Sequence, residues 1–441
     1  MRKLLSGMFF VLAVMCGTDV YAMDLSLSDA VNKILSESND LKKAEANVKQ
    51  AKAQLDAVNA NRWFTIDASA NYMSLINVER PFSSDGFALP PELGQLIQSQ
   101  LGDDAKFAIP DNILMAGVSI TQPIYTFGKI GNAVDSVRSA IKMSESSREM
   151  TRREIKYSAT DMYWTAKMTD KIVELARKDL SDAVESKNKL TGAGRANRSN
   201  LVKIESDIAS KEINLSDAEF NRDTAHRMLK ILAGIDINEE LNLVDDFPTE
   251  FAELNVPEKL SSTPEWDVLK EQVNMYQSKA SSQRANGYPT LAAVGNYSYN
   301  TMGGSIDRMF EKSGAQSAYW GISLQMPIFA GGLHRANATV DAMNAEAARQ
   351  DLDKSKKIVS EQYENAIKKY DHLRGNLETL ENARNLAAKA FQFSQERFAS
   401  GQTSAIELAE VSSGLYQLDM ALINSKYNIL MAQESVNKLG K

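Results

Sequence analysis

Two glutamates near the C-terminal end form the clearest pattern in this sequence that could do chemistry. Glu407 and Glu410 are three residues apart in a segment with helical periodicity, so their carboxylates lie on one face of a helix. Such a pair can attract cations and line a polar passage. It can equally be an ordinary solvated charge pair on a helix surface, and the residues alone leave both interpretations open.

Other residues with catalytic potential are scattered along the chain. The histidines, His226, His334 and His372, have no carboxylate or cysteine cluster at metal-ligand spacing, and we expect them to be solvated. Residues 192–195 resemble a phosphate loop, but they follow a helix and lack a third glycine, which favours a turn. The sequence also lacks a nucleophile motif and a P-loop. It therefore predicts a protein that is not an enzyme and has no cofactor or metal.

The composition narrows the class of protein further. The chain has 441 residues, 43% of them hydrophobic, with one cysteine and a formal net charge of −7. One cysteine argues against a disulfide framework, and the acidic balance gives no basic stripe for nucleic-acid phosphates. We expect no nucleic-acid partner.

The first 22 residues are typical of an export signal. Arg2 and Lys3 precede an apolar run, and Ala22 offers a small residue at the cleavage point, so the mature chain would begin at Met23. Lipidation of Cys16 is the alternative that the residues leave open. No later stretch has 18 uninterrupted apolar residues, which argues against a transmembrane helix.

The sequence contains an internal duplication. Residues 117–128 and 321–332 share the pattern Gly-x-Ser-aliphatic, then Pro-Ile-aromatic, then Gly, at an offset of 204. Further matches lie on both sides of these motifs. We expect two structural repeats, residues 23–232 and 264–441, joined by a linker over residues 233–263.

Long helices are predicted in both repeats. Residues 128–194 and 332–401 contain no proline, and apolar or small residues recur there at heptad spacing, as in coiled coils. Gly194 and Gly401 would be hairpin turns to a second, shorter helix. Because that helix covers only half of the long one, we expect a further helix, such as residues 28–62, to be stacked end to end with it.

Four segments alternate apolar and polar residues with period two, which is typical of strands. Pro123 and Pro327 cannot donate to a ladder and suit strand ends. Each is followed five residues later by a glycine, Gly128 or Gly332, and these four residues mark strand–helix junctions. The expected strands are residues 63–74, 114–125, 289–300 and 318–329.

Strands with one apolar and one polar face, behind an export signal, fit a transmembrane barrel. Four strands are too few for a closed barrel, so several chains would have to contribute to one. A soluble half-buried sheet is the alternative.

The sequence resembles the TolC-like outer-membrane channel proteins of efflux pumps and type I secretion systems. The resemblance covers essentially the whole mature chain. It rests on the helix start at residues 25–31 (LSLSDAV), the strand ends at residues 122–125 (QPIY) and 326–329 (MPIF), and the turn at Gly401.

The resemblance implies an α+β membrane protein and a homotrimer. Four strands per chain would form a 12-stranded transmembrane β-barrel in outer-membrane lipid, continued into the periplasm by a trimeric α-barrel of long antiparallel coiled-coil helices. Residues 233–263 would then be an equatorial linker. Residues 79–110 and the shorter segment 302–314 would be extracellular loops.

The same resemblance implies an exit duct that passively conducts cargo, with a periplasmic adaptor (membrane fusion) protein and an inner-membrane transporter of RND, ABC or MFS type as partners. The alternative is a structural coiled-coil protein of the periplasm or cell surface. Within the resemblance, the adaptor would contact the turns at Gly194, Arg195, Gly401 and Gln402.

The pore constriction is likewise implied by resemblance. Glu407 and Glu410 match positions that carry acidic rings, and crowding of these charges in a trimer would raise some of their pKa values. Phe398 and Thr403 stand where the family's best-known member has a latching tyrosine and arginine, and Asn200 replaces an aspartate. We therefore expect the closed state to be held differently or less firmly.

Overall fold

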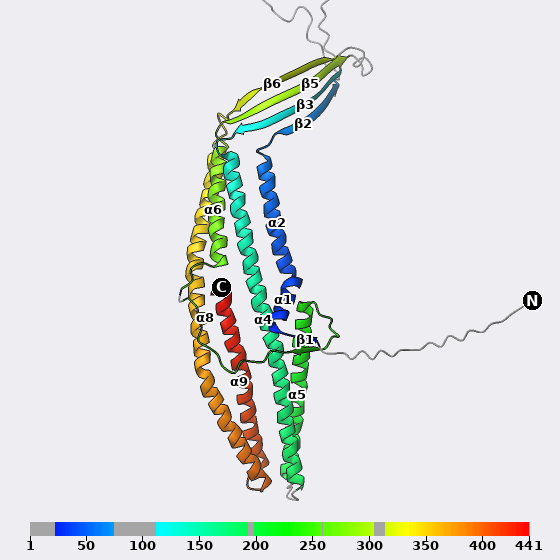
Figure 1. Ribbon diagram of the computed structural model, residues 1–441, viewed down its shortest axis with the longest axis vertical. Coiled ribbons are helices and arrows are strands. Elements are labelled where there is room, and N and C mark those ends of the chain that lie inside the picture. The colour runs from blue at the N-terminus through cyan, green and yellow to red at the C-terminus, as the bar shows by residue number, and fades with distance from the viewer. Residues whose placement is uncertain (1–22, 75–111, 193–197, 258, 304–313, 441) are drawn as a thin grey trace, which may run out of the picture. The chain divides into compact units, whose positions relative to one another are not determined.

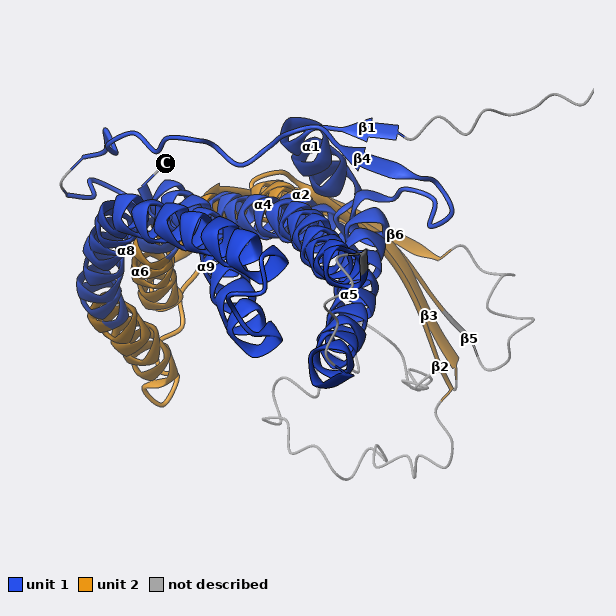
Figure 2. Ribbon diagram, turned by 90° about the horizontal axis from the view of Figure 1, so that it is seen from below, with its two compact units in different colours: residues 1–48, 144–268, 351–441 blue, residues 49–143, 269–350 orange. Residues whose placement is uncertain are grey.

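The computed structural model describes residues 23–74, 112–192, 198–257, 259–303 and 314–440. They form two compact units. Unit 1 comprises the described residues of Met1–Val48, Ser144–Val268 and Asp351–Lys441, and unit 2 comprises those of Lys49–Met143 and Leu269–Gln350 (Figure 2). The expected signal peptide with Cys16, the loop over 79–110 and the turn residues Gly194 and Arg195 lie outside the described residues.

Two long helices dominate the described chain, α4 (Lys129–Gly192) and α8 (Leu333–Ala399) (Figure 1). Their 64 and 67 residues confirm the prediction of long proline-free helices, and α4 alone extends about 96 Å at 1.5 Å per residue. Each is followed by a helix of 36 residues, α5 (Arg198–Ala233) and α9 (Ala405–Gly440). In the described part of the chain, no helix is long and apolar enough to span a bilayer.

The N-terminal helix differs from its prediction. Residues 28–62 do not form one helix but two, α1 (Leu27–Glu37) and α2 (Asn39–Ala60). The break is at Ser38, whose ψ of 118° ends α1 and whose Oγ accepts a hydrogen bond from the Leu41 N–H at the start of α2. The helix α6 (Pro264–Ala285) starts at a proline, which suits a first helical position because its missing N–H needs no partner there.

Unit 2 contains a four-stranded antiparallel sheet in the order β2-β3-β5-β6. The four expected strand segments are confirmed, with shifted ends: β6 finishes before Pro327, so residues 326–329 are not part of a strand, and Pro123 lies inside β3 beside a register irregularity. The strands are β2 (Thr65–Ser74), β3 (Asn112–Tyr125), β5 (Thr290–Gly303) and β6 (Ala315–Gln325).

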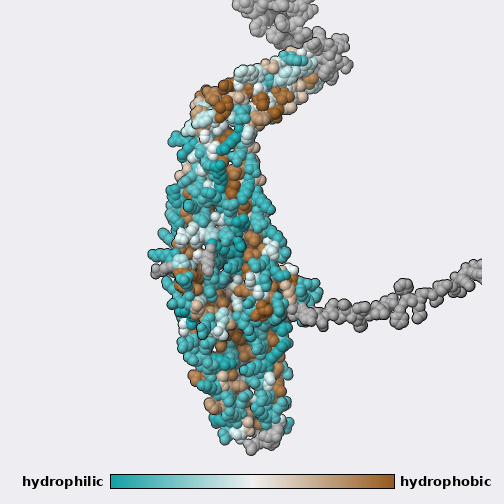
Figure 3. Space-filling view, viewed as in Figure 1, coloured by the Kyte–Doolittle hydropathy of each residue, from teal (hydrophilic) through white to brown (hydrophobic). Residues whose placement is uncertain are grey.

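The register gives this sheet two chemically different faces. Directly paired residues in antiparallel strands point to the same side. One side carries rows such as Ile66–Ile120–Gly295–Trp320 and Ala68–Val118–Tyr297–Ala318. The other carries Asp67–Ser119–Asn296–Tyr319 and Ser69–Gly117–Ser298–Ser317. Figure 3 shows hydrophobic and hydrophilic side chains together over the strands, with the hydrophobic ones gathered along one border of the sheet.

Unit 1 contains a short parallel pair that the sequence analysis missed, β1 (Met23–Leu25) with β4 (Leu241–Leu243). Its core combines Leu25 with Tyr163 and Trp164 of α4, and Phe247 stacks on the Trp164 ring. The Tyr163 hydroxyl donates to the Asp245 carboxylate at 2.9 Å. The segment after α5 is thus fixed to α4 through specific side chains.

Candidate functional site

The turn between α8 and α9 is built around Gly401. The Gln402 N–H donates to the Arg397 carbonyl at 2.8 Å and the Gly401 N–H donates to the Phe398 carbonyl at 3.0 Å, which is the Schellman pattern. Gly401 has φ +77° and open space around the position of a Cβ. The glycine is therefore required by backbone conformation and not by crowding, and the hairpin turn predicted at Gly401 is confirmed.

The start of α9 is a capping box that the sequence analysis overlooked. The Glu407 N–H donates to Ser404 Oγ at 3.2 Å, and the Ser404 N–H donates back to Glu407 Oε2 at 3.3 Å. Thr403 Oγ1 donates to the same carboxylate oxygen at 2.7 Å. The signal was readable as Ser-x-x-Glu at residues 404–407.

These bonds change the interpretation of the acidic pair. The hydrogen bond from Thr403, and then that from the Ser404 backbone, lower the pKa of Glu407 below its ordinary value within one chain. The rise expected from crowded carboxylates concerns the trimer and stays a prediction. Glu410 is exposed, and the described residues offer it no hydrogen bond or ion pair. Both glutamates lie on the exposed side of α9, away from the buried Ala405 and Leu408.

Of the other residues expected at the constriction, one is buried in the core and two lie at the surface. Phe398 is only 3% exposed and packs with Leu190, Ile204, Ala405 and Leu408. A side chain in this position is part of the chain's own core, so we correct its expected position on the pore surface. Thr403 and Asn200 are partly exposed, the latter in the first turn of α5.

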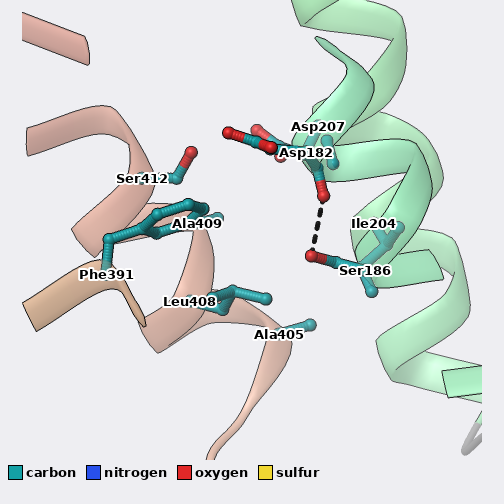
Figure 4. A pocket seen from close by; sticks show the side chains of 10 residues that line it. Asp182, Ser186, Ile204, Asp207, Phe391, Ala405, Leu408, Ala409 and Ser412 are labelled. Carbon is teal, nitrogen blue, oxygen red and sulfur yellow. Dashed lines mark hydrogen bonds between the residues drawn. The ribbon is translucent and has the colours of Figure 1, made fainter. Parts of the chain in front are cut away.

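A small cavity with a mainly apolar lining adjoins this core in unit 1 (Figure 4). Asp182 of α4 and Asp207 of α5 both line this cavity, and Ser412 of α9 lines it from the opposite side. Burial raises the pKa of the Asp182 carboxyl and of the Asp207 carboxyl. The remaining wall consists of Ala183, Ser186, Ile204, Phe391, Ala405, Leu408 and Ala409.

Mild acidification should stabilise the helices around this cavity. Because the folded state holds protons on Asp182 and Asp207 more tightly than the unfolded chain does, stability rises as the pH falls through their raised pKa values toward the ordinary value of 3.8. Asp246 has the opposite effect on the pH dependence of stability. The hydrogen bond from Lys167 lowers the pKa of Asp246, so the stability that its ionised carboxylate contributes is lost only as the pH falls below 3.8.

Amide hydrogen exchange over a pH series from about 7 down to about 4, corrected for intrinsic rates, measures both effects. Protection of residues 182–186 should increase, while that of residues 243–247 should stay unchanged. Decreased protection around Asp182 at the lower pH would contradict this sign.

The histidines form no common site. His226 is partly buried, with Nε2 2.9 Å from Asp170 Oδ1, so the expectation that it is solvated is wrong because its ring links α5 to α4. His334 is partly buried and His372 is exposed. In the described ranges, no group of three or more His, Cys, Asp or Glu residues could hold a metal ion.

The strand–helix junction glycines adopt the left-handed conformation. Gly128 has φ +88° and Gly332 has φ +79°, and they lie immediately before α4 and α8. Pro123 lies inside β3, two residues before the strand ends, and Pro327 lies two residues after the end of β6. These residues shape the backbone where strand becomes helix.

Comparisons with known proteins assign the chain to a family. The model of the family described as outer membrane efflux protein matches residues 30–234 and 257–439. The probable outer membrane lipoprotein SilC of Salmonella typhimurium is 18% identical over 423 residues, which cover 92% of this chain and 84% of SilC.

Solved structures share the fold. The CmeC outer membrane channel of Campylobacter jejuni has a TM-score of 0.76 at 18% identity, covering 94% of this chain and 85% of CmeC. The open state of the MtrE outer membrane channel of Neisseria gonorrhoeae has a TM-score of 0.76 at 17% identity, covering 94% of this chain and 88% of MtrE. With most of its length matched by the family model, this chain is a member of the outer membrane efflux protein family.

Proposed function

We propose that this outer-membrane protein is the exit duct of a tripartite efflux pump or a type I secretion system, through which cargo passes without chemical change. The observation that carries the proposal is the two-faced sheet of unit 2, whose apolar rows suit lipid and whose polar rows suit a water-filled lumen. The transporter of the inner membrane, of RND, ABC or MFS type, would supply the energy.

The unpaired sheet edges support assembly as a homotrimer. Among the described residues of one chain, β2 and β6 each pair with a single strand, so each leaves one row of backbone groups without a strand partner there. In lipid every such group costs several kcal/mol. Three copies paired β6 to β2 would close a barrel of about 12 strands, within the range of known membrane barrels.

Large aromatic side chains collect at one end of the sheet. Because β2 and β5 begin where β3 and β6 finish, residues 63–64, 125–127, 288 and 326–329 all lie at that end. Trp63, Phe64, Tyr125, Tyr288 and Phe329 are exposed there. Aromatic residues favour the membrane–water interface, so this end suits the periplasmic boundary of the membrane.

The helices carry apolar side chains that one chain leaves uncovered. On α5, Val202, Ile213, Phe220 and Ile231 follow spacings of 11, 7 and 11 residues, which keeps them on one face, and all four are exposed. On α8, Leu386 and Phe393 are exposed one heptad apart. Neighbouring copies in a ring would cover both stripes through a head-to-tail contact.

The domain boundaries and the adaptor contacts stay part of the proposal. We propose two repeats, residues 23–232 and 264–441, with an equatorial linker over residues 233–263. Gly401 and Gln402 are exposed at the turn and are available to a periplasmic adaptor protein. Gly194 and Arg195 are proposed to do the same for the other hairpin.

Removing the acidic pair should weaken cation block of the channel. In a trimer, Glu407 and Glu410 would give two rings of three carboxylates, which concentrate negative potential at the constriction beside Asn200 and Thr403. Glu407→Gln with Glu410→Gln should reduce block by a trivalent cation added from the periplasmic side by about tenfold or more. Glutamine also keeps the capping box, so the substitution removes charge without removing the cap.

Single-channel recording of the purified protein measures this block. Glu361→Gln with Glu364→Gln, a pair at the same spacing on an exposed part of α8, is the matched control and should leave block unchanged. A double variant at Glu407 and Glu410 that is blocked as strongly as wild type would assign these residues to a solvated surface.

Export from cells tests the proposed function. Deleting the gene in the native host should cause cargo or a toxic efflux substrate to accumulate, and the wild-type gene should restore export. A protein that salt alone releases from cells as a monomer, with export unaffected by the deletion, would favour a structural coiled-coil protein instead.

A further inference from the structure

A buried lysine stands at the junction of three helices near the turns. Lys211 of α5 is 6% exposed, and its Nζ lies 2.7 Å and 2.6 Å from the two carboxylate oxygens of Asp179 in α4. An ion pair this deeply buried is costly to break by removing one partner, because the remaining charge stays in a poorly solvated site. Lys211 and Asp179 therefore hold the α4–α5 hairpin together at this level.

The third member of the cluster comes from the other hairpin. Ser412 of α9 is buried, accepts a hydrogen bond from Lys211 Nζ at 3.3 Å and donates one to Asp179 Oδ1 at 3.0 Å. Its hydroxyl therefore bonds to both charges of the pair. With Ser412 in place, the three Nζ protons have three acceptors.

Several charged groups surround the Ser412 hydroxyl. The cavity beside it carries a surplus of negative charge, with Lys211 as the buried cation among several carboxylates. Asp207 Oδ2 lies 3.9 Å from Lys211 Nζ, and burial raises the pKa of both Asp207 and Asp182. The groups that face the cluster are Lys178, Asp179, Asp182 and Glu185 from α4, Asp207 and Lys211 from α5, and Tyr416 from α9.

We propose that Lys211, Asp179 and Ser412 form a polar lock that fixes α9 to the α4–α5 hairpin. We also propose that the constriction at the turn-bearing end of the helices opens only when Ser412 leaves the ion pair. The claim about opening rests on the proposed channel function. Ser412 is then a positioning residue, because it sets where the Glu407 and Glu410 carboxylates stand without contacting cargo. When it leaves, Lys211 and Asp179 keep each other as partners, so the α4–α5 hairpin stays intact while α9 moves.

A cysteine reporter inside the cavity measures the lock directly. Ser186 of α4 is buried and donates only to the Asp182 carbonyl of its own helix, so Ser186→Cys leaves the lock in place. The background carries Cys16→Ser, which removes the one native cysteine. Alkylation of the purified protein should be slow with the lock intact, because the reagent reaches the thiol only when α9 separates from α4 and α5.

Ser412→Ala should raise the alkylation rate about tenfold, because hydrogen bonds to charged groups are lost. Lys211→Met should raise it about a hundredfold, because Asp179 is left buried without its cation. Ser413→Ala, an exposed neighbour on the same helix, is the matched control and should leave the rate unchanged. Equal rates for Ser412→Ala, Ser413→Ala and the unsubstituted reporter chain would overturn the lock.

Conductance tests, with a different readout, the claim that the constriction opens only when Ser412 leaves the ion pair. In bilayers, Ser412→Ala should spend about tenfold more time open than wild type, and Ser413→Ala should match wild type. If wild type does not conduct at all, the proposed function fails, but the alkylation rates still decide whether the lock exists. Faster alkylation without more open time would show that the lock holds α9 but does not control opening.

Discussion

Arginine in place of Val118 should prevent the protein from assembling in the outer membrane, while arginine in place of Ser119 should be tolerated. The two residues are neighbours on the central strand β3, and the register puts Val118 in an apolar row and Ser119 in a polar row. An arginine on the lipid side of a membrane barrel costs about 2–4 kcal/mol near the bilayer midplane. Three copies would carry this cost three times.

The measurement is the fraction of folded, heat-modifiable trimer in outer-membrane extracts. Val118→Arg should leave little of it, and Ser119→Arg should stay close to wild type because a lumen accepts charge. Equal assembly of both variants would mean that the two faces of the sheet do not meet lipid and water.

A second large effect is expected at the uncovered stripe of α5. Phe220 is 72% exposed in one chain, the kind of large apolar side chain that anchors interfaces. Phe220→Asp should destabilise each contact between copies by about 2 kcal/mol or more, since it removes an aromatic anchor and buries a charge. The trimer should therefore dissociate at concentrations where wild type stays assembled.

Analytical ultracentrifugation in detergent reports the oligomeric state of each variant. Asn221→Asp adds the same charge one residue further along α5, where the side chain points about 100° away, and should leave the trimer intact. A Phe220→Asp protein that remains trimeric at all concentrations would place the contact between copies elsewhere.

Local periodicity was enough to predict the long helices and the four strands of the sheet. Heptad and two-residue patterns are properties of contiguous sequence, and the structure retains them in the helices α4 and α8 and in the strands β2, β3, β5 and β6. The sequence analysis did not predict the strand pair β1 and β4, because each strand has three residues and its partner is more than 200 residues away. It also did not predict the helix break at Ser38, because a single serine in an otherwise helical pattern is a weak signal.

The candidate site was predicted less completely. The sequence identified Glu407 and Glu410 as a surface pair and Gly401 as a turn, both of which depend on local conformation. It could not show that Phe398 turns inward, because that depends on Leu190 and Ile204 from the other hairpin. Lys211 was overlooked for the same reason, since its partners Asp179 and Ser412 lie 32 and 201 residues away.

Ion conductance of the purified full-length protein in a planar lipid bilayer tests the central claim most directly. We expect discrete conductance steps from a preparation that is trimeric in detergent, and no steps from the Val118→Arg protein. A stable monomer that conducts, or a trimer that inserts and never conducts under any voltage or pH, would contradict the assignment of this chain as an exit duct of the outer membrane.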